Sequence, residues 1–239
     1  PYVGESAFAH KGGAHIDGVL KNPVTFEHIE PKLVGNQRRF LLSEQSGGAT
    51  VLAKLEKIYP DLDKNGPRVK AVLAELKKKE HEGYQYEAAQ GSFELLAARI
   101  IDGWKEPFKL GGFRVITDRR DDGSMVSEAT IKVMANGAEE HTASEGDGPV
   151  DALNGGLGKG LYRFYPNIAS VHLKDYRVRV LESTHGTEAK VRVLIESSNG
   201  EEAWGTVGVS ENVIEASYIA LVDSFMYQLV FDERKVMKR

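Results

Sequence analysis

The sequence predicts an α+β protein: small helical linker subdomains, followed by a domain of two pseudo-twofold-related βββα units. Three observations support this class. Apolar residues recur with a helical period from Ala49 to Gly103, and with the period of a strand after the Gly111–Gly112 pair. Two Asn-Gly pairs, typical of tight hairpins, stand 63 positions apart, at 136 and 199. Similar segments recur at almost the same offset, which indicates an internal duplication.

Two segments of the first part have the spacing of amphipathic helices. The first places apolar residues at i, i+3, i+4 and i+7, namely Val69, Val72, Leu73 and Leu76. Proline suits a first helical turn and glycine a helix end, so this helix should begin at Pro67 and stop at Gly83. The second carries its apolar residues at Phe93, Leu96, Ala97, Ile100 and Ile101. Ser92 is its predicted N-cap.

The second part alternates in the manner of strands. Apolar and polar residues alternate in 131–133, 176–180 and 191–195. Asn136–Gly137 and Asn199–Gly200 are predicted two-residue hairpins. Because the period changes at Gly111–Gly112, we place the domain boundary there. Residues 1–110 then form the linker subdomains, and residues 111–239 form the strand-rich domain.

The strand-rich part repeats itself. When Ala152 is aligned with Ala216, the residues before them match in kind. The matched pairs are Gly146 with Ser210, Asp147 with Glu211, Gly148 with Asn212, Val150 with Ile214, and Asp151 with Glu215. The two helices should begin near Pro149 and Val213. One such unit buries too little surface alone, so the two should pack together.

Composition excludes several classes of protein. The chain is 41% hydrophobic and 28% charged, with a net charge of -4, which argues against nucleic acid as a partner. It has no cysteine, hence no disulfide or thiolate zinc site. The most apolar stretch, Val213 to Phe231, carries Glu215 and Asp223, so we expect no membrane span. Without a secretory leader, and with Pro1 at the start, the sequence predicts a cytoplasmic fragment of a longer protein.

A segment near the start gathers histidines, glycines and an acid. It runs from Glu5 to Val19, with the sequence ESAFAHKGGAHIDGV. His10 and His15 are five positions apart, off any common helix or strand face, and no third ligand accompanies them, so we predict no metal site. A histidine that donates a hydrogen bond to a substrate, or one that polarises a carbonyl, is the alternative we favour. The segment also lacks a nucleophile and a cofactor loop, which argues against a self-contained active site.

These residues resemble the segment that follows the catalytic barrel in the alpha-isopropylmalate synthase family. Further blocks, in the same order, resemble its citramalate synthase branch. They are residues 33–39 (LVGNQRR), 43–47 (SEQSG), 81–87 (HEGYQYE), 91–96 (GSFELL) and 204–217 (WGTVGVSENVIEAS).

The resemblance implies linker subdomains and a regulatory dimerisation domain of an enzyme that condenses acetyl-CoA with a 2-oxo acid. That acid is pyruvate in the citramalate branch, and a branched-chain amino acid inhibits by feedback. His15, with His10 as a weaker companion, is implied to reach the active site of the partner in a homodimer. The catalytic barrel, with its divalent metal, needs about 200 residues and would precede Pro1. This chain alone is therefore expected to hold no cofactor and to be inactive.

The duplicated helix starts form a candidate effector site. Its residues are Gly146, Asp147, Gly148, Pro149 and Val150 from one repeat, and Ser210, Glu211, Asn212, Val213 and Ile214 from the other. Helix N-termini suit a carboxylate, the two acids suit an ammonium, and the aliphatic residues suit a branched side chain. Isoleucine is the favoured ligand. A leucine-inhibited isopropylmalate synthase, or a dimerisation module without ligand, are the alternatives.

The first repeat helix is unusually rich in glycine. It carries Gly155, Gly156, Gly158 and Gly160, and each interior glycine costs about 1 kcal/mol relative to alanine. We expect another helix to approach this face closely. The alternative is a marginal helix that becomes ordered when a ligand or partner binds.

Overall fold

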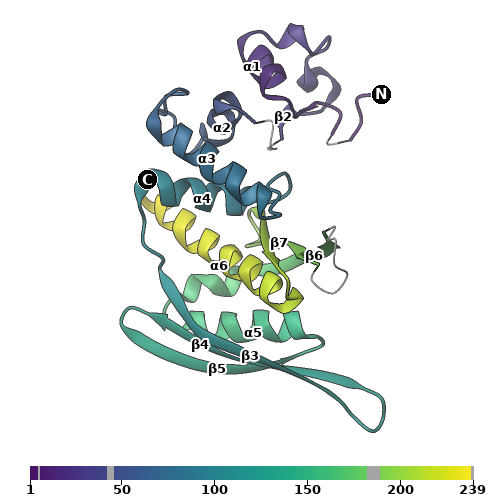
Figure 1. The fold of residues 1–239 in the computed structure, drawn as a ribbon, viewed down its shortest axis with the longest axis vertical. Coiled ribbons are helices and arrows are strands. Elements are labelled where there is room, and N and C mark those ends of the chain that lie inside the picture. The colour runs from purple at the N-terminus through teal and green to yellow at the C-terminus, as the bar shows by residue number, and fades with distance from the viewer. Residues whose placement is uncertain (5, 42–45, 182–188, 238–239) are drawn as a thin grey trace. The chain divides into compact units, whose positions relative to one another are not determined.

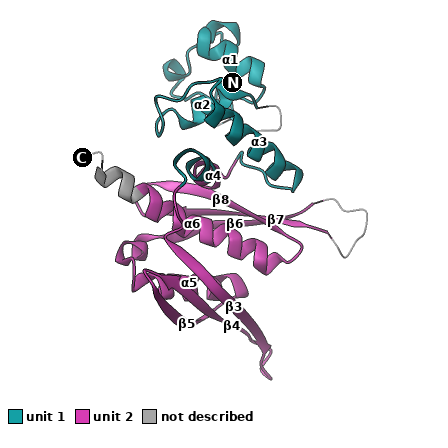
Figure 2. Ribbon diagram, turned by 60° about the vertical axis from the view of Figure 1, so that its left-hand side comes forward, with its two compact units in different colours: residues 1–87, 96–103 teal, residues 88–95, 104–239 magenta. Residues whose placement is uncertain are grey.

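The computed structural model describes residues 1–4, 6–41, 46–181 and 189–237 (Figure 1). Two parts of the resemblance, Glu5 and residues 43–45, lie outside this range. Contacts divide the chain into two compact units (Figure 2). Unit 1 comprises Pro1–Glu87 and Leu96–Gly103, and unit 2 comprises Ala88–Leu95 and Trp104–Arg239. Helices and small separate sheets coexist, so the α+β prediction is confirmed.

Unit 1 is built from short elements. They are β1 (Ala9–His10), α1 (Gly13–Lys21), η1 (Pro23–Thr25), η2 (Pro31–Val34), β2 (Arg39–Phe40), α2 (Gly48–Leu55), α3 (Pro67–His81) and the later residues of α4 (Gln90–Asp102). β1 and β2 pair in parallel, with Ala9 opposite Arg39. The helices pack through buried side chains that include Ile16, Val51 and Leu76.

The predicted limits of α3 are confirmed. Pro67 occupies its first turn, and the buried residues are Val69, Val72 and Leu76. The helix ends at His81, and Gly83 follows with a φ of 108°. In this left-handed conformation Tyr84 N–H returns to the carbonyl of Lys79, as glycine-terminated helices do. The glycine of the HEGYQYE block is thus explained by the helix end.

Ser92 is not the N-cap of α4, because the helix begins two residues earlier, at Gln90. Its hydroxyl donates to Asp223 Oδ2 at 2.7 Å and accepts from Val207 N–H at 3.0 Å. Gly91 lies against β8, since an added Cβ would be 2.9 Å from the carbonyl oxygen of Gly205. The first turn of α4 therefore packs inside unit 2, to which it belongs, and Ser92 contributes to that packing instead of capping the helix.

Unit 2 contains two antiparallel three-stranded sheets with strands in sequence order (Figure 1). The first is β3 (Phe108–Arg119), β4 (Met125–Ala135) and β5 (Ala138–Gly146), followed by α5 (Pro149–Tyr162) and η3 (Pro166–Ser170). The second is β6 (His172–Val180), β7 (Val191–Ser198) and β8 (Ala203–Ser210), followed by α6 (Val213–Met237). Both helices begin at the predicted residues.

The two Asn-Gly pairs behave differently. Asn136 and Gly137 both have positive φ, 52° and 78°, and form the predicted two-residue hairpin between β4 and β5. The second pair opens a four-residue loop between Ser198 and Ala203. There Asn199 Oδ1 accepts from the N–H groups of Glu201 and Glu202. This side-chain turn lengthens the loop, so the prediction of a two-residue turn was wrong at this position.

Gly111 and Gly112 lie inside β3, where the register with β4 shifts between Leu110 and Gly112. Gly112 has a φ of 145°, and a Cβ on Gly111 would lie 3.2 Å from the Lys132 side chain. The pair thus marks a bulge in a strand. The chain changes from helix to strand earlier, between Asp102 and Phe108. The division into domains at residues 110 and 111 stays a prediction.

Both sheets and both helices of unit 2 contribute to one hydrophobic core. It includes Ile131 and Val133 of β4, Leu157 of α5, Ile195 of β7 and Phe225 of α6. Figure 1 shows α5 and α6 side by side in this unit. Shared burial explains why neither repeat needs a complete core of its own.

The glycines of α5 face the sheet, not another helix. A Cβ on Gly155 would lie 2.6 Å from Ser144 Oγ, and one on Gly160 would lie 3.1 Å from Val133 Cγ2. Only Gly158 faces α6, and its added Cβ would be in ordinary contact with Phe225, at 3.8 Å. The expectation of a closely packed second helix was therefore wrong, because strands β4 and β5 supply the close neighbours.

Residues Val213–Phe231 of α6 are long and apolar enough to cross a membrane by length and composition alone, and half of that stretch is buried in the folded unit. Ala216, Ala220 and Leu221 lie in the shared core. The helix thus packs as the core helix of unit 2.

Candidate functional site

His15 is exposed on α1, a helix whose other face buries Ile16 and Val19. Its imidazole stacks on the ring of Phe26, with centroids 4.3 Å apart and planes 25° apart. Two residues on, Asp17 forms ion pairs with Lys21, at 2.6 Å, and with Lys64. Hydrogen bonds from these lysines lower the pKa of Asp17 to about 2. His15 is thus the accessible histidine of the predicted segment.

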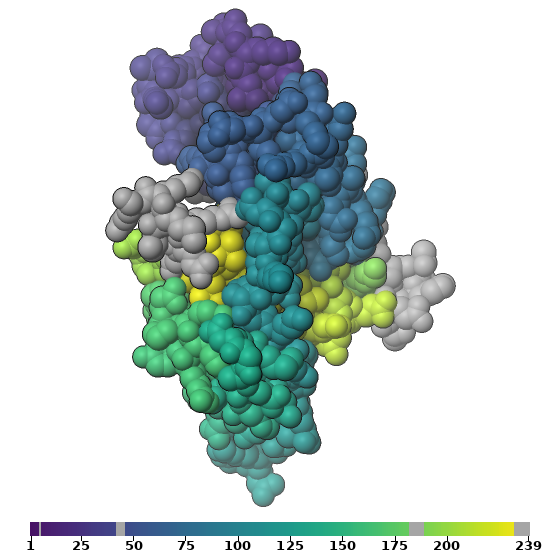
Figure 3. All heavy atoms as spheres, turned by 90° about the vertical axis from the view of Figure 1, so that its left-hand side faces the viewer, coloured from purple at the N-terminus to yellow at the C-terminus, as the bar shows by residue number. Residues whose placement is uncertain are grey.

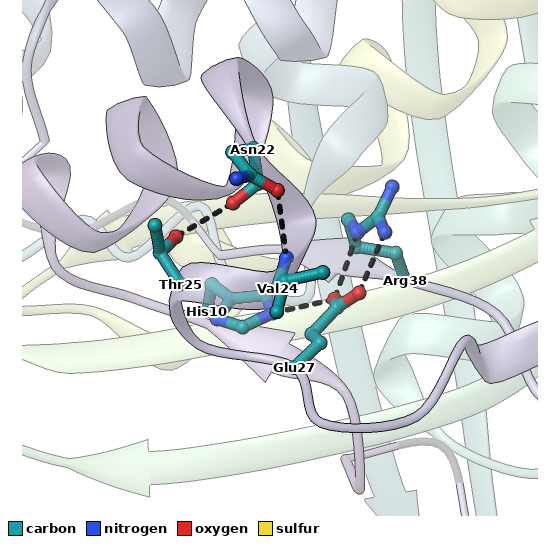
Figure 4. Close-up of polar contacts among 6 residues, drawn as sticks. All are labelled: His10, Asn22, Val24, Thr25, Glu27 and Arg38. Atoms are coloured by element: carbon teal, nitrogen blue, oxygen red, sulfur yellow. Dashed lines mark hydrogen bonds and ion pairs between the residues drawn. The ribbon is translucent and has the colours of Figure 1, made fainter.

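His10 has a different environment. Its Nε2 lies 2.8 Å from Glu27 Oε1, and its side chain is only 11% exposed (Figure 4). Arg38 donates from Nε to Glu27 Oε1 at 2.8 Å, and from Nη2 to Oε2 at 2.6 Å. The Glu27 side chain is 2% exposed. Hydrogen bonds from Arg38, then from His10, hold the pKa of Glu27 below its usual value despite burial.

The two histidines therefore differ in their environments. His10 ties β1 to a buried carboxylate, whereas His15 presents its ring at the surface. No hydrogen bond or ion pair joins them in the described chain. Across the described residues, no group of three or more histidine, aspartate or glutamate side chains is placed to hold a metal ion.

The start of α5 has no side-chain cap. Its N-cap, Gly148, has an extended backbone, with φ -155° and ψ 171°, and a Cβ there would meet nothing within 4 Å. The N–H groups of Val150 and Asp151, in the first turn, have no partner in the described chain. Gly146 has a structural role, because its Cβ would lie 2.4 Å from the backbone nitrogen of Ala152. Pro149 occupies the first turn, as predicted.

The start of α6 is capped by the protein itself. Asn212 Oδ1 accepts from Ile214 N–H at 2.8 Å and from Glu215 N–H at 3.3 Å. Ser210 Oγ donates to Glu215 Oε2 at 2.5 Å and accepts from Asn212 N–H at 3.1 Å. The two helix starts, which match in sequence, therefore differ in available donors. Because glycine has no side-chain oxygen and asparagine has one, only the α5 start leaves its first-turn N–H groups open.

The remaining predicted residues lie around these starts. Asp147, Glu211 and Val213 are exposed, and Asp147 N–H bonds to Asp151 Oδ2 at 3.2 Å. Val150 and Ile214 are partly buried and pack against the same core. No hydrogen bond or ion pair connects residues 146–150 with residues 210–214, all of which the structure describes. The shared core is therefore what relates the two halves of the predicted site.

Comparison with known families covers most of the chain. Residues 87–229 match the model of the LeuA allosteric (dimerisation) domain. The chain belongs to this LeuA domain family. Residues 2–83 match a second model, described as a homocitrate synthase post-HMGL domain-like region. The two matches meet between residues 83 and 87, close to where α3 ends.

Several relatives of this LeuA-family chain are named (R)-citramalate synthase. An (R)-citramalate synthase of Aquifex aeolicus is 51% identical over 98% of this chain and 45% of its own length. Those of Geobacter sulfurreducens and Synechocystis are each 49% identical, over 95% and 96% of this chain and 43% of their own lengths. The chain thus spans less than half the length of these relatives, and the resemblance to the isopropylmalate synthase family is confirmed.

The sequence analysis missed the structural roles of three residues of the histidine region, Phe26, Glu27 and Arg38, although Arg38 stands in the LVGNQRR block. Each stands in a segment of mixed polarity with no periodic pattern. Nothing local marks Glu27 as buried, because its burial depends on a cation 11 positions later. The only signal in the sequence is an acid and an arginine 11 positions apart in a region that contains histidines. This combination is too common in proteins to indicate a buried ion pair.

Proposed function

We propose that this chain is the linker and regulatory part of a citramalate synthase, whose whole protein condenses acetyl-CoA with pyruvate and is inhibited by isoleucine. The names of the relatives and the matched LeuA allosteric domain support this proposal. The catalytic barrel and its divalent metal then belong to the part of the protein that this chain does not include. The described residues offer no ligand set for that metal.

The observation that carries the effector assignment is the open start of α5. A carboxylate bound there accepts from the N–H groups of Val150 and Asp151, in the favourable field of the helix N-terminus. The ammonium group of the same ligand pairs with exposed carboxylates, Asp147 from this repeat and Glu211 from the other. Asn212 already occupies the α6 start, so the second repeat contributes side chains, not backbone donors.

The aliphatic part of the ligand lies beside Val150, Val213 and Ile214. Val150 and Ile214 border one shared core, while Val213 is exposed. A branched side chain inserted among them buries apolar surface that is otherwise partly open to water. Choice among isoleucine, leucine and valine is a matter of one methyl group, worth about 1–3 kcal/mol.

The second part of the proposal is a homodimer formed through unit 2, supported by the family's description as a dimerisation domain. Unit 2 exposes several large apolar residues: Ile116, Met125, Met134, Val178 and Val180. β5 pairs with β4 only from Ser127 onward, so the tip of the β3–β4 hairpin has no third strand. Figures 1 and 3 show this teal tip projecting from the unit. Such apolar surface is typical of an interface.

The third part concerns His15. In the dimer, unit 1 carries the exposed imidazole of His15 into the active site of the partner subunit, where it donates a hydrogen bond to a substrate oxygen. Its surface position on α1 supports this role. His10 is hydrogen-bonded to Glu27 and contributes indirectly, by holding β1 in place.

Calorimetric titration of the chain with isoleucine, leucine and valine tests the effector site. Gly148→Leu should fold normally, because nothing lies within 4 Å of its Cβ position, and should raise the Kd for isoleucine by about tenfold or more. Gly47→Leu is the matched control, because Gly47 is also an uncapped helix N-cap with free space around it. If all three amino acids fail to bind at millimolar concentration, while the chain is a dimer, the chain is a dimerisation module without this ligand.

A further inference from the structure

The stack of His15 on Phe26 is a feature that neither the family matches nor the relatives' names assign. Phe26 is 46% exposed, so its ring does not belong to the core of unit 1. The exposed part of a phenylalanine gains little from hydrophobic burial. Its ring instead covers one face of the His15 imidazole at 4.3 Å, in a near-parallel arrangement.

The helix beneath is shaped to receive this ring. A Cβ on Gly18 would lie 2.8 Å from Phe26 Cε2, closer than side-chain contacts allow. Thr25 Oγ1 would lie 3.4 Å from the same position. Any residue other than glycine at position 18 therefore displaces Phe26. Gly18 is the glycine of the IDGV segment, three positions after His15 and on the adjoining surface of α1.

The turn that carries Phe26 is fixed on both sides (Figure 4). Before it, Asn22 Oδ1 accepts from Val24 N–H at 3.2 Å, and the carbonyl of Asn22 accepts from the Thr25 hydroxyl at 2.7 Å. After it, Glu27 is anchored by Arg38 and His10. The backbone of Phe26 thus lies between a capped turn and a buried ion pair, which fixes the direction in which its Cβ leaves the chain.

We propose that Phe26 is a positioning residue for His15, and that Gly18 and the Asn22–Glu27 turn exist to hold its ring against the imidazole. The stack restricts His15 to one side-chain orientation on an otherwise exposed helix face. A pre-oriented imidazole loses less entropy when it meets a reacting group. The inference rests on the proposed role of His15, and it adds the residues that aim it.

Histidine ring resonances of the labelled chain, measured by NMR, test the stack directly. The face of a phenyl ring moves nearby protons upfield, so the His15 ring protons should move downfield in Phe26→Leu. Phe26→Tyr and Phe26→Trp should keep the upfield position, and Gly18→Ala should produce a partial downfield shift. Val24→Ala, whose side chain is 76% exposed, is the neighbouring control. Exposed His172 is the internal reference, and an unchanged His10 resonance shows that the Glu27 anchor is intact.

In the full-length enzyme, Phe26→Leu should lower kcat about tenfold while KM for the 2-oxo acid changes less than about twofold. Phe26→Tyr, which keeps an aromatic ring at this position, should leave kcat close to that of the wild type. Unchanged His15 resonances in Phe26→Leu would overturn the positioning role. An unchanged rate in His15→Gln would instead overturn the proposed role of His15, whatever the resonances show, so the two failures are distinct.

Discussion

The hydroxyl of Ser92 donates a hydrogen bond to Asp223, 131 positions later in the chain, at 2.7 Å. The same hydroxyl accepts from the N–H of Val207, which is buried in β8. Next to it, Tyr227 donates to Glu94 Oε2 at 2.9 Å. Burial raises the pKa of the Tyr227 hydroxyl well above its usual range, so it remains a donor. These hydrogen bonds of Ser92 and Glu94, which we call the polar seam, hold the start of α4 against β8 and α6.

Ser92→Ala should destabilise unit 2 by about 1–3 kcal/mol, because it leaves the buried N–H of Val207 without its acceptor. Urea unfolding, followed by the fluorescence of Trp204, measures the loss. Trp204 reports on this region because its indole N–H bonds to the carbonyl of Ser224 on α6.

Ser170→Ala is the control for this change. Ser170 is exposed in the same unit, and its hydroxyl reaches only the carbonyl of Asn167. A loss within about 0.5 kcal/mol is expected there. Equal losses for Ser92→Ala and Ser170→Ala would contradict a structural role for the seam.

Gly208→Ala should be among the most damaging small substitutions in the chain. An added Cβ would lie 1.9 Å from the carbonyl oxygen of Ala216, in the backbone of α6. Backbone cannot move aside as a flexible side chain can, so β8 and α6 must separate. We expect a loss of about 3 kcal/mol, or a fall in Tm of about 6–12 °C by scanning calorimetry.

Gly148→Ala is the control for this change, because Gly148 also lies in unit 2 and an added Cβ there would meet no atom within 4 Å. Its backbone is extended, so alanine introduces no strain. A Tm close to that of the wild type is expected. If Gly208→Ala unfolds at that same temperature, the close approach of α6 to β8 is incorrect.

Local chemistry was sufficient to predict several elements. Pro67 and Gly83 set the limits of α3, Asn136–Gly137 set a hairpin, and the duplication set the starts of α5 and α6. The helix limits and the hairpin depend on residues within a few positions of one another, whereas the duplication compares segments 64 positions apart, such as those before Ala152 and Ala216. The α+β class followed from the change of period.

Two features that the sequence could not predict, the role of Ser92 and the neighbours of the α5 glycines, depend on distant partners. Serine is a common N-cap residue, but the hydroxyl of Ser92 instead forms hydrogen bonds with Val207 and Asp223. The α5 glycines face strands because β4 and β5, not α6, come closest. In the candidate site, matched positions suggested equal helix starts. The starts differ because Asn212 accepts a hydrogen bond from the N–H of Ile214, in the first turn of α6. Gly148, at the matching position of α5, has no side chain that could do the same.

Glu27→Gln should loosen unit 1, because Arg38 and His10 lose a buried carboxylate. Breaking such a pair costs about 3 kcal/mol. Hydrogen exchange of the amides in β1 and β2 should accelerate, since both strands are anchored through this cluster. Glu30→Gln is the control, because Glu30 is exposed in the same segment. Equal exchange in the two variants would exclude Glu27 as the anchor.

The same cluster predicts a pH dependence with a defined sign. The pKa of Glu27 is lower in the folded chain than its usual 4.5. Its stabilisation is therefore fully present above pH 4.5 and is lost as pH falls through the lower, folded value. Protection of β1 and β2 should decline below pH 4.5 in the wild type and change less in Glu27→Gln. A wild-type profile that is flat down to pH 3 would contradict the ion pair.

The glycines of α5 give a prediction of opposite sign at neighbouring positions. At Gly158 an added Cβ would meet only Phe225 Cζ at 3.8 Å, an ordinary contact. Gly158→Ala should therefore raise the free energy of unfolding, by up to about 1 kcal/mol, because alanine restricts the unfolded chain and favours the helix. At Gly155 the Cβ would lie 2.6 Å from Ser144 Oγ. Gly155→Ala should lower the free energy of unfolding by about 1–3 kcal/mol, since the packing against β5 must open.

Urea unfolding of the two variants, with amide exchange through α5, separates packing from disorder as the reason for these glycines. If packing against the sheet requires these glycines, the amides of α5 exchange slowly without ligand. Alanine then lowers the free energy of unfolding only at the glycines in tight contact. If the helix instead becomes ordered only on binding, its amides exchange quickly in the free chain, and both alanines stabilise it. The contacts at Gly155 and Gly160 favour the first outcome, because an added Cβ would lie only 2.6 Å from Ser144 Oγ and 3.1 Å from Val133 Cγ2.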